Sequence, residues 1–231
     1  MPDKIRTLGT KSPNNDKDFL ITKFYISLSL ERKMEGPKLV DNEKLIKDFG
    51  ADRISSLSEK PDFYSFQTGV LVSHRDFSKF FSALKQGKKS AILSGVNASG
   101  SLHLGHKAVF DTNLFFQKKY GIPVYIPISD DESYVAGKVS SQEEALKNSM
   151  RLAKELLAYG FNPNKTFFII DQIYTNIYNF AIKLSRKFTL SEVKATYGYK
   201  NEDNPGLYFY PAIQAAHVLF PQEKLKAHTL V

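Results

Sequence analysis

From residue 90 onward, short apolar runs alternate with longer stretches in which apolar residues recur at helical spacing. Three short runs rich in β-branched or aromatic residues predict strands: SAILSGV (90–96), IPVYIPISD (122–130) and TFFIID (166–171). Apolar residues recur every three or four positions in the stretches 106–121, 141–160 and 178–188, which predicts helices. This alternation indicates a parallel sheet with helices on both faces.

Capping residues mark further helix ends, and composition separates an N-terminal extension from the rest of the chain. Ser141 with Glu144, and Thr189 with Glu192, have the spacing of capping boxes, and a long apolar run follows at 207–220. Upstream, the helical spacing of 39–50 ends at a glycine that suits a C-cap. We therefore expect an N-terminal α+β extension over 1–89, disordered over 1–18, and an α/β domain over 90–231.

The composition restricts the class of protein. A chain of 231 residues with 18 Phe can build one large core, and its net charge of +8 favours a polyanionic partner such as nucleic acid or a nucleotide, or simply solvates a surface. The absence of cysteine excludes disulfides, thiolate metal sites and zinc fingers. The first twenty residues lack an apolar core, so neither a signal peptide nor a membrane span is expected there, and we expect a cytoplasmic protein.

The turn after the first predicted strand, SGVNASGSLHLGHK (94–107), is the strongest candidate for chemistry. Ligands of such sheets bind beyond the carboxyl ends of the strands, and Gly105 would let a flat ring lie against the backbone. His103 and His106 stand three apart at the start of a predicted helix, where free N–H groups favour a phosphate. The alternative is a chance His-Leu-Gly-His with two ordinary surface imidazoles.

The tetrapeptide at 103–106 resembles the ATP-binding HIGH motif of class I aminoacyl-tRNA synthetases, and further segments narrow this to the tryptophanyl-tRNA synthetases of archaeal and eukaryotic type. The segments that carry the resemblance, from about residue 39 to 222, are VSHRDF (72–77), the 94–107 turn, ISDDESY (128–134), KFTLSEVKATYGY (187–199) and YPAIQAA (210–216). The resemblance implies a Rossmann-like domain over 90–231, incomplete at its C-terminal end.

What the resemblance implies is ATP-dependent activation of tryptophan and its transfer to tRNA(Trp), with Mg²⁺ carried by the phosphates and no metal held by the protein alone. By resemblance, His103 and His106 would be catalytic and would bind ATP with Ser99, Gly100 and Gly105. Glu132 and Gln214 would bind the α-ammonium of the amino acid, since a carboxylate and an amide oxygen are suitable acceptors.

Several of these residues also have plainer interpretations. The acidic cluster 130–132 could be a solvated strand end or could cap the element that follows, and Gln214 could be a polar residue satisfied by backbone groups. The segment 74–76 could be a charged turn rather than part of an ATP site, and Lys107 could face either anions or solvent.

The chain also departs from the family pattern. No segment resembles the KMSKS-like loop, whose lysine stabilises the pyrophosphate in the family, so we do not expect strong activity from the chain alone. Pro127 stands where some members carry a glutamine for aromatic recognition. The alternatives are therefore a non-catalytic paralogue that binds tryptophan or a nucleotide, a relative of the tyrosyl enzymes, or another nucleotidyltransferase. We expect an incomplete sheet to have a bare strand edge that favours association or poor solubility. The resemblance implies a homodimer, and a complementing C-terminal fragment is the other expected partner. The basic segment 1–38 is a candidate for tRNA contact.

Overall fold

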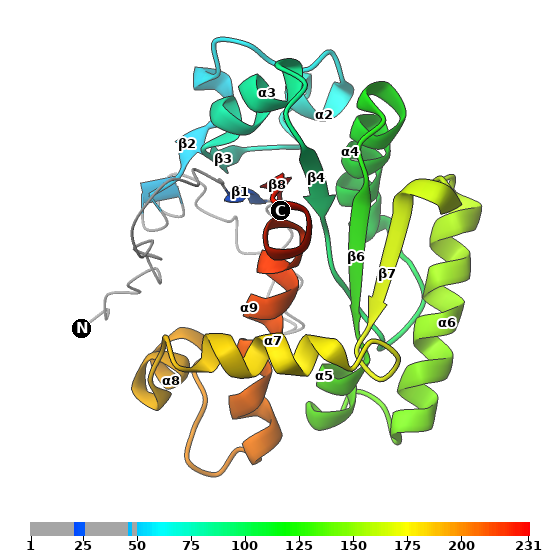
Figure 1. Ribbon diagram of the computed structural model, residues 1–231, viewed down its shortest axis with the longest axis vertical. Coiled ribbons are helices and arrows are strands. Elements are labelled where there is room, and N and C mark those ends of the chain that lie inside the picture. Colours follow the sequence, from blue (N-terminus) through cyan, green and yellow to red (C-terminus); the bar gives the residue numbers. More distant parts are fainter. Residues whose placement is uncertain (1–20, 26–45, 48–49) are drawn as a thin grey trace, which may run out of the picture.

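A mixed, largely parallel sheet organises the computed structural model, which describes residues 21–25, 46–47 and 50–231 (Figure 1). The strands in the described residues are β1 (Ile21–Tyr25), β2 (Asp52–Arg53), β3 (Ser73–Arg75), β4 (Ser90–Leu93), β5 (Val96–Asn97), β6 (Val124–Ser129), β7 (Thr166–Ile170) and β8 (His228–Leu230). Their order is β2-β3-β1-β8-β4-β6-β5, and β7 pairs with the other edge of β6.

Helices connect the strands and cover both faces. The described helices are α2 (Tyr64–Gln67), α3 (Phe77–Lys85), α4 (Leu104–Tyr120), α5 (Asp130–Val135), α6 (Gln142–Tyr159), α7 (Asn176–Ser185), α8 (Leu190–Tyr197) and α9 (Pro205–Leu225), with short 3₁₀ turns at Ile54–Ser56 and Pro163–Lys165. Helices α4 and α6 lie on one side of the sheet and α9 on the other (Figure 1). The expected Rossmann-like architecture is therefore present.

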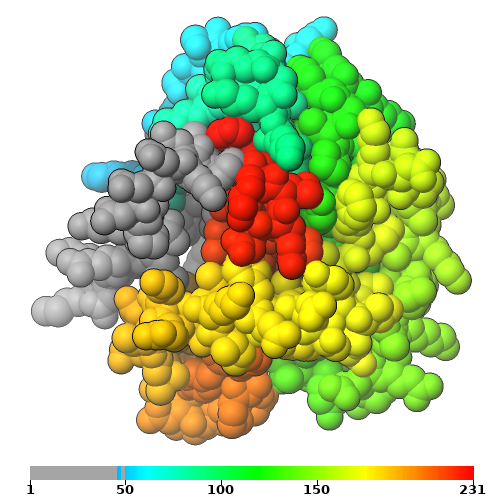
Figure 2. Space-filling model, in the orientation of Figure 1, coloured from blue at the N-terminus to red at the C-terminus, as the bar shows by residue number. Residues whose placement is uncertain are grey.

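The central strands alternate their side chains between two apolar cores. Ile92, Val124 and Ile126 belong to a core shared with α3, α4 and α6, whereas Leu93 and Tyr125 face the side of α9. This period of two is what a sheet buried on both faces requires. The C-terminal end of α9 and β8 fill the middle of one face, between α3 and α7 (Figure 2).

Parallel pairing is continuous from β8 through β4 and β6 to β7. Ala91 lies opposite Thr229 of β8, Ile92 lies opposite Val124 of β6, and Val124 lies opposite Thr166 of β7. The carboxyl ends of these strands therefore meet at one edge of the molecule. The turns and helix starts that leave this edge carry the predicted site residues, except Gln214, which lies within α9.

The far edge of β8 is paired, whereas β7 pairs only with β6 among the described residues, so the expected bare edge does not lie at β8. Strand β1 pairs in parallel with β8, with Ile21 opposite Thr229, and pairs in antiparallel orientation with β3. The N-terminal part of the chain thus supplies the next strand of the sheet and satisfies the backbone groups that an open edge would expose.

Most predicted boundaries agree with the structure, whereas two boundaries and one predicted cap differ. The predicted strand 90–96 is split into β4 and β5 at Ser94 and Gly95, and the acidic cluster forms the first turn of α5 rather than a strand end. Thr189 and Glu192 form the expected capping box, whereas Glu144 accepts from Ser140 instead of completing one with Ser141. The predicted disorder over 1–18 and most of the predicted helix 39–50 fall outside the described residues.

The residues between 50 and 89 share the main core with the rest of the described chain. Phe66 and Phe77 from this segment pack edge-on or tilted around Phe116 of α4, which is fully buried. Aromatic rings in such arrangements contribute beyond the area that they bury. The boundary at 89/90 stays a prediction, and the packing across it is continuous.

We predict that Phe116→Ala lowers the free energy of unfolding by about 3–5 kcal/mol, because it leaves a ring-sized cavity in this cluster. Phe209→Ala is the matched control, since that ring is 39% exposed, and it should cost less than about 1 kcal/mol. Urea unfolding followed by circular dichroism measures both. Equal losses in the two variants would contradict the assignment of the core.

Candidate functional site

The two histidines of the HLGH segment cap helix α4 reciprocally. Gly105 donates its backbone N–H to Nδ1 of His103 at 3.1 Å, and His103 donates its backbone N–H to Nδ1 of His106 at 3.2 Å. The two rings are stacked with their centroids 3.9 Å apart. A capping box is usually formed by Ser or Thr with Glu or Gln, so the sequence pattern gave no sign of this one.

These hydrogen bonds fix which ring nitrogen can meet a ligand. Because Nδ1 of each histidine accepts, a neutral imidazole must carry its proton on Nε2, and Nε2 is the nitrogen left for a ligand. Burial lowers the pKa of His106, with the neighbouring His103 as a smaller cause, so the neutral form is favoured. The expectation of free helix N–H groups is corrected: the N–H groups of His103 and Gly105 are already bonded, and the imidazoles present the donors instead.

Gly105 is required by the His103 cap. A Cβ at this position would lie 2.9 Å from Cε1 and 3.0 Å from Nδ1 of His103, closer than van der Waals contact allows. The other predicted ATP-binding residues of the turn, Ser99 and Gly100, are exposed and half-buried respectively, and a Cβ at Gly100 would meet no atom within 4 Å. The two glycines therefore have different structural roles.

Helix α6 holds the turn between β5 and α4. Asn148 donates its side-chain amide to the carbonyl oxygen of Ala98 at 3.1 Å, and the backbone N–H of Leu102 donates to Oε2 of Glu155 at 3.0 Å. Both contacts join residues about fifty positions apart in sequence. They fix the backbone on either side of Ser99 and Gly100.

Glu132, in the first turn of α5, is engaged by two donors. Its Oε2 accepts from Nδ2 of Asn97, at the end of β5, and its Oε1 pairs with Nζ of Lys138 at 2.7 Å. Ser133 in turn donates to Oδ1 of Asn97 at 2.5 Å. Neither Asn97 nor Lys138 was predicted as a site residue, because their contacts depend on how β5 meets α5.

Gln214 lies on α9 and is exposed, and its side-chain oxygen accepts from the hydroxyl of Tyr197 on α8. One turn earlier on α9, Tyr210 donates its hydroxyl to Oγ of Ser129 at 2.9 Å, at the end of β6. The negative charge of Glu132 is a secondary cause, after burial, of the raised pKa of Tyr210, so these groups share one electrostatic environment. The structure thus brings α5, α8 and α9 together at the carboxyl end of β6.

Behind Glu132 lies a cluster of buried carboxyl groups. Asp130 accepts from the backbone N–H of Asp171 at 3.0 Å and from the side-chain amide of Gln172 at 2.8 Å. Nε2 of His217 lies 2.6 Å from Oδ1 of Asp171, and burial lowers the pKa of His217 to about 4, so the ring is neutral and donates. The cluster is therefore a hydrogen-bonded network and not a solvated strand end.

Burial raises the pKa of both Asp131 and Asp171 to about 7, and the two carboxyl groups interact. Ligand atoms of Asp130, Asp131 and Asp171 lie within 4.8 Å of one another, a spacing that a metal ion could occupy. Hydrogen bonds satisfy Asp130, and burial favours the protonated forms of Asp131 and Asp171, so we assign no metal to the cluster.

Other sequence candidates have structural partners. Lys107 pairs with Asp111 one turn along α4, with 2.5 Å between Nζ and Oδ2, and Asp111 also accepts from Tyr64 and Tyr159.

His74 is buried in β3 and its Nδ1 accepts from the backbone N–H of Phe77 at 3.4 Å. Strands β1 and β8 separate β3 from β4 in the sheet, so this segment lies apart from the HLGH turn.

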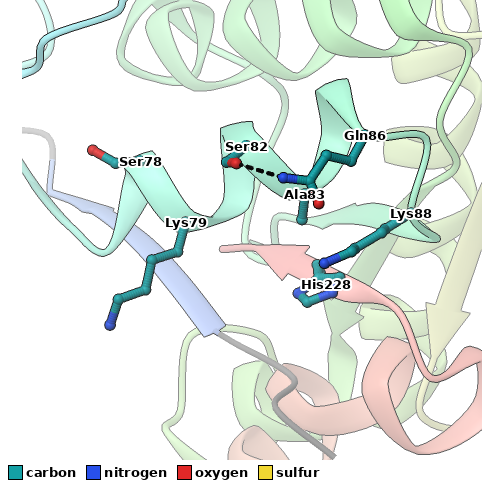
Figure 3. Close-up of a pocket in the computed structure, with 7 residues that line it drawn as sticks. All are labelled: Ser78, Lys79, Ser82, Ala83, Gln86, Lys88 and His228. Atoms are coloured by element: carbon teal, nitrogen blue, oxygen red, sulfur yellow. Dashed lines mark hydrogen bonds between the residues drawn. The ribbon is translucent and has the colours of Figure 1, made fainter.

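A shallow cavity of about 370 Å³ lies elsewhere, between α3 and the amino ends of β4 and β8 (Figure 3). Its lining includes Lys79, Lys88 and His228, and the last two side chains lie next to each other (Figure 3). Because His228 stands opposite Ser90 at the start of β4, the cavity is at the opposite end of the sheet from the histidine pair.

We predict that Gly105→Ala lowers the free energy of unfolding by about 1 kcal/mol relative to Gly100→Ala, because the new Cβ displaces His103 from its capping position. Urea unfolding of the two variants gives the difference, and proton NMR of the imidazole CH groups reports the movement of the His103 ring. Equal stability with an unmoved ring would contradict the cap.

The buried carboxyl pair predicts a pH effect. Asp131 and Asp171 bind protons more tightly in the folded chain than in the unfolded chain, so they lower stability as the pH rises between about 4 and 7. Asp131→Asn should therefore gain stability over the wild type as the pH rises from 5 to 8, by on the order of 1 kcal/mol. Urea unfolding at both pH values measures it. Asp62→Asn, at an exposed position, is the control, and a gain that did not depend on pH would exclude the raised pKa values.

Comparisons with known proteins agree with the geometry. Residues 85–228, more than half of the chain, match the family described as tRNA synthetases class I (W and Y). The tryptophan–tRNA ligase of Methanocaldococcus jannaschii is 34% identical over 192 residues, which are 81% of this chain and 51% of that one. The tryptophan–tRNA ligase of Thermococcus onnurineus is 32% identical over 196 residues, 80% of this chain and 50% of that one. The chain spans about half the length of these relatives.

Solved structures show the same fold. The tryptophanyl-tRNA synthetase from Trypanosoma brucei superposes with a TM-score of 0.71 at 29% identity, covering 81% of this chain and 62% of that one. The enzyme from Encephalitozoon cuniculi, solved bound to tryptophan, gives a TM-score of 0.69 at 25% identity and covers 76% of this chain and 55% of that one. The expected family is thereby confirmed, and the chain belongs to the class I aminoacyl-tRNA synthetases of the tryptophanyl and tyrosyl group.

Proposed function

We propose that this chain supplies the ATP- and amino-acid-binding part of a tryptophan–tRNA ligase, which forms tryptophanyl-adenylate from tryptophan and ATP and transfers the tryptophanyl group to tRNA(Trp). The observation that carries the proposal is the stacked pair His103 and His106, held by reciprocal caps with both Nε2 atoms left for a ligand. The names of the archaeal relatives support the choice of substrate.

The chemistry asks for preorganised hydrogen-bond donors. In adenylate formation the amino-acid carboxylate attacks the α-phosphorus of ATP, and pyrophosphate leaves with the electrons of the broken P–O bond. Negative charge is spread over the phosphate oxygens in the transition state, and donors that are already fixed stabilise it without reorganisation. His103 and His106 fit this role because α4 and their own caps hold the rings. Mg²⁺ bound by the phosphates would offset further negative charge.

The amino acid would be held by its α-ammonium group. Glu132 provides a carboxylate and Gln214 an amide oxygen, at the carboxyl end of β6, where ligands of parallel sheets bind. Ser99, Gly100 and Gly105 would line the ATP side. A homodimer, a complementing C-terminal segment and tRNA remain proposed partners. The predicted cytoplasmic location also stays a prediction, and no described helix has the length and apolar character to cross a bilayer.

One observation favours a second candidate function. Pro127 is buried in β6 and has no side-chain donor or acceptor, although by resemblance this is a position for recognition of the aromatic ring. Such a site would suit a paralogue that binds an amino acid or nucleotide without activating tryptophan, or one that prefers tyrosine.

The test is amino-acid-dependent ATP–pyrophosphate exchange by the 231-residue chain, supplied with tryptophan, with tyrosine or with neither. His103→Asn is the informative variant, because Asn can retain the helix cap while removing the imidazole Nε2. We expect tryptophan-dependent exchange once the C-terminal segment of a full-length relative is added in trans, little or no exchange by the chain alone, and a loss of about 100-fold in His103→Asn at an unchanged unfolding midpoint.

The other outcomes separate the alternatives. Exchange that depends on tyrosine would assign the chain to the tyrosyl enzymes. Tryptophan binding by calorimetry without exchange, both alone and with the C-terminal segment added, would favour the binding paralogue. Equal exchange in the wild type and in His103→Asn would remove the histidine pair from the chemistry.

A further inference from the structure

The acceptors proposed for the substrate ammonium are already used by the protein itself. Oε1 of Glu132 pairs with Nζ of Lys138 at 2.7 Å, Oε2 of Glu132 accepts from Asn97, and the side-chain oxygen of Gln214 accepts from Tyr197. Of these donors, only Lys138 carries a positive charge on a primary ammonium group. It is therefore the one that matches the chemistry of an amino-acid ligand.

The fold directs Lys138 back toward Glu132. Helix α5 ends at Val135, and Gly137 follows with a φ of +66°, a left-handed conformation that turns the chain. The backbone N–H of Lys138 then donates to the carbonyl oxygen of Ser133 at 2.9 Å. This turn returns a long, flexible ammonium side chain to the first turn of its own helix, where Glu132 lies.

The exposures of the two partners differ. The side chain of Glu132 is 15% exposed and that of Lys138 is 43% exposed. The carboxylate is thus held within the protein, whereas the ammonium reaches it from the solvent side. Such a cation can leave the pair for water while the carboxylate stays in place.

We propose that Lys138 is an internal competitor for the α-ammonium of the amino acid, so that a ligand binds Glu132 by displacing Nζ of this lysine. This inference rests on the proposed function, because it takes Glu132 as the ammonium ligand. Two cations at one carboxylate repel each other, so the ligand and Lys138 exclude one another at Oε1. Lys138 thereby limits affinity, and it does so only for ligands that carry an ammonium group.

The experiment compares Lys138→Met with the wild type in equilibrium binding of L-tryptophan. The chain contains no tryptophan, so fluorescence excited at the long-wavelength edge of the indole band, beyond the absorption of its 12 tyrosines, comes from the ligand alone. A partly exposed ion pair contributes up to about 1 kcal/mol, and we therefore expect Lys138→Met to lower the Kd for tryptophan about fivefold. Lys138→Arg, which keeps the charge, should bind no tighter than the wild type.

Two controls isolate the ammonium group and the charge. Indole-3-propionate has the indole ring and the carboxylate but no ammonium, and its Kd should be the same for the wild type and Lys138→Met. Lys147→Met removes an equal charge at an exposed position on α6 and should leave the Kd for tryptophan unchanged. Thermal unfolding checks that each variant is folded.

The outcomes separate this inference from the proposed function. Binding of tryptophan to Lys138→Met alone, or about fivefold more tightly than to the wild type, supports the competitor. If the wild type binds tryptophan and Lys138→Met binds it equally or more weakly, the inference is wrong and the proposed function stands. If neither chain binds tryptophan or tyrosine, the amino-acid site is wrong and the inference fails with it.

Discussion

Strand β6 is hydrogen-bonded on both edges, and this two-sided pairing fixes where the acidic part of the candidate site lies. All six of its residues are buried, with β4 and β5 on one side and β7 on the other. A strand held in this way cannot shift its register without moving both cores, because a slip of one residue exchanges the two faces. Its carboxyl end runs directly into α5, so the position of Glu132 is set by the register of the sheet rather than by a loop.

The same constraint explains the buried carboxyl cluster. The end of β6 carries Asp130 and the end of β7 carries Asp171, and parallel pairing brings the two ends together whatever their charge. Taking carboxylates out of water is costly unless they are hydrogen-bonded or protonated. The structure uses both solutions. Backbone and amide groups donate hydrogen bonds to Asp130, whereas Asp171 accepts from neutral His217 and has a raised pKa that favours its protonated form.

The sequence was informative where local chemistry decides the structure. Gly121 and Gly160 end α4 and α6 in left-handed conformations, and Thr189 forms its capping box, because these devices depend on residues a few positions apart. The contacts of Asn97 and Lys138 with Glu132 could not be predicted in this way. They join β5, α5 and the turn after it, and nothing in the local spacing indicates which oxygen each donor reaches. The pairing of β1 with β8 likewise joins segments that are far apart in the sequence, so local spacing does not predict it.

A site whose acceptors are satisfied by its own side chains differs from an open cleft. An unpaired carboxylate at Glu132, which is largely buried, would destabilise the free chain, so Lys138 and Asn97 stabilise the fold in the same contacts that would oppose a ligand. Ligand binding then exchanges one hydrogen bond for another, and its net free energy is the difference between them. Because Lys138 is more exposed than Glu132 and the histidine pair is fixed by its own caps, the proposed amino-acid side of the site would be the adjustable half and the proposed ATP side the preorganised one.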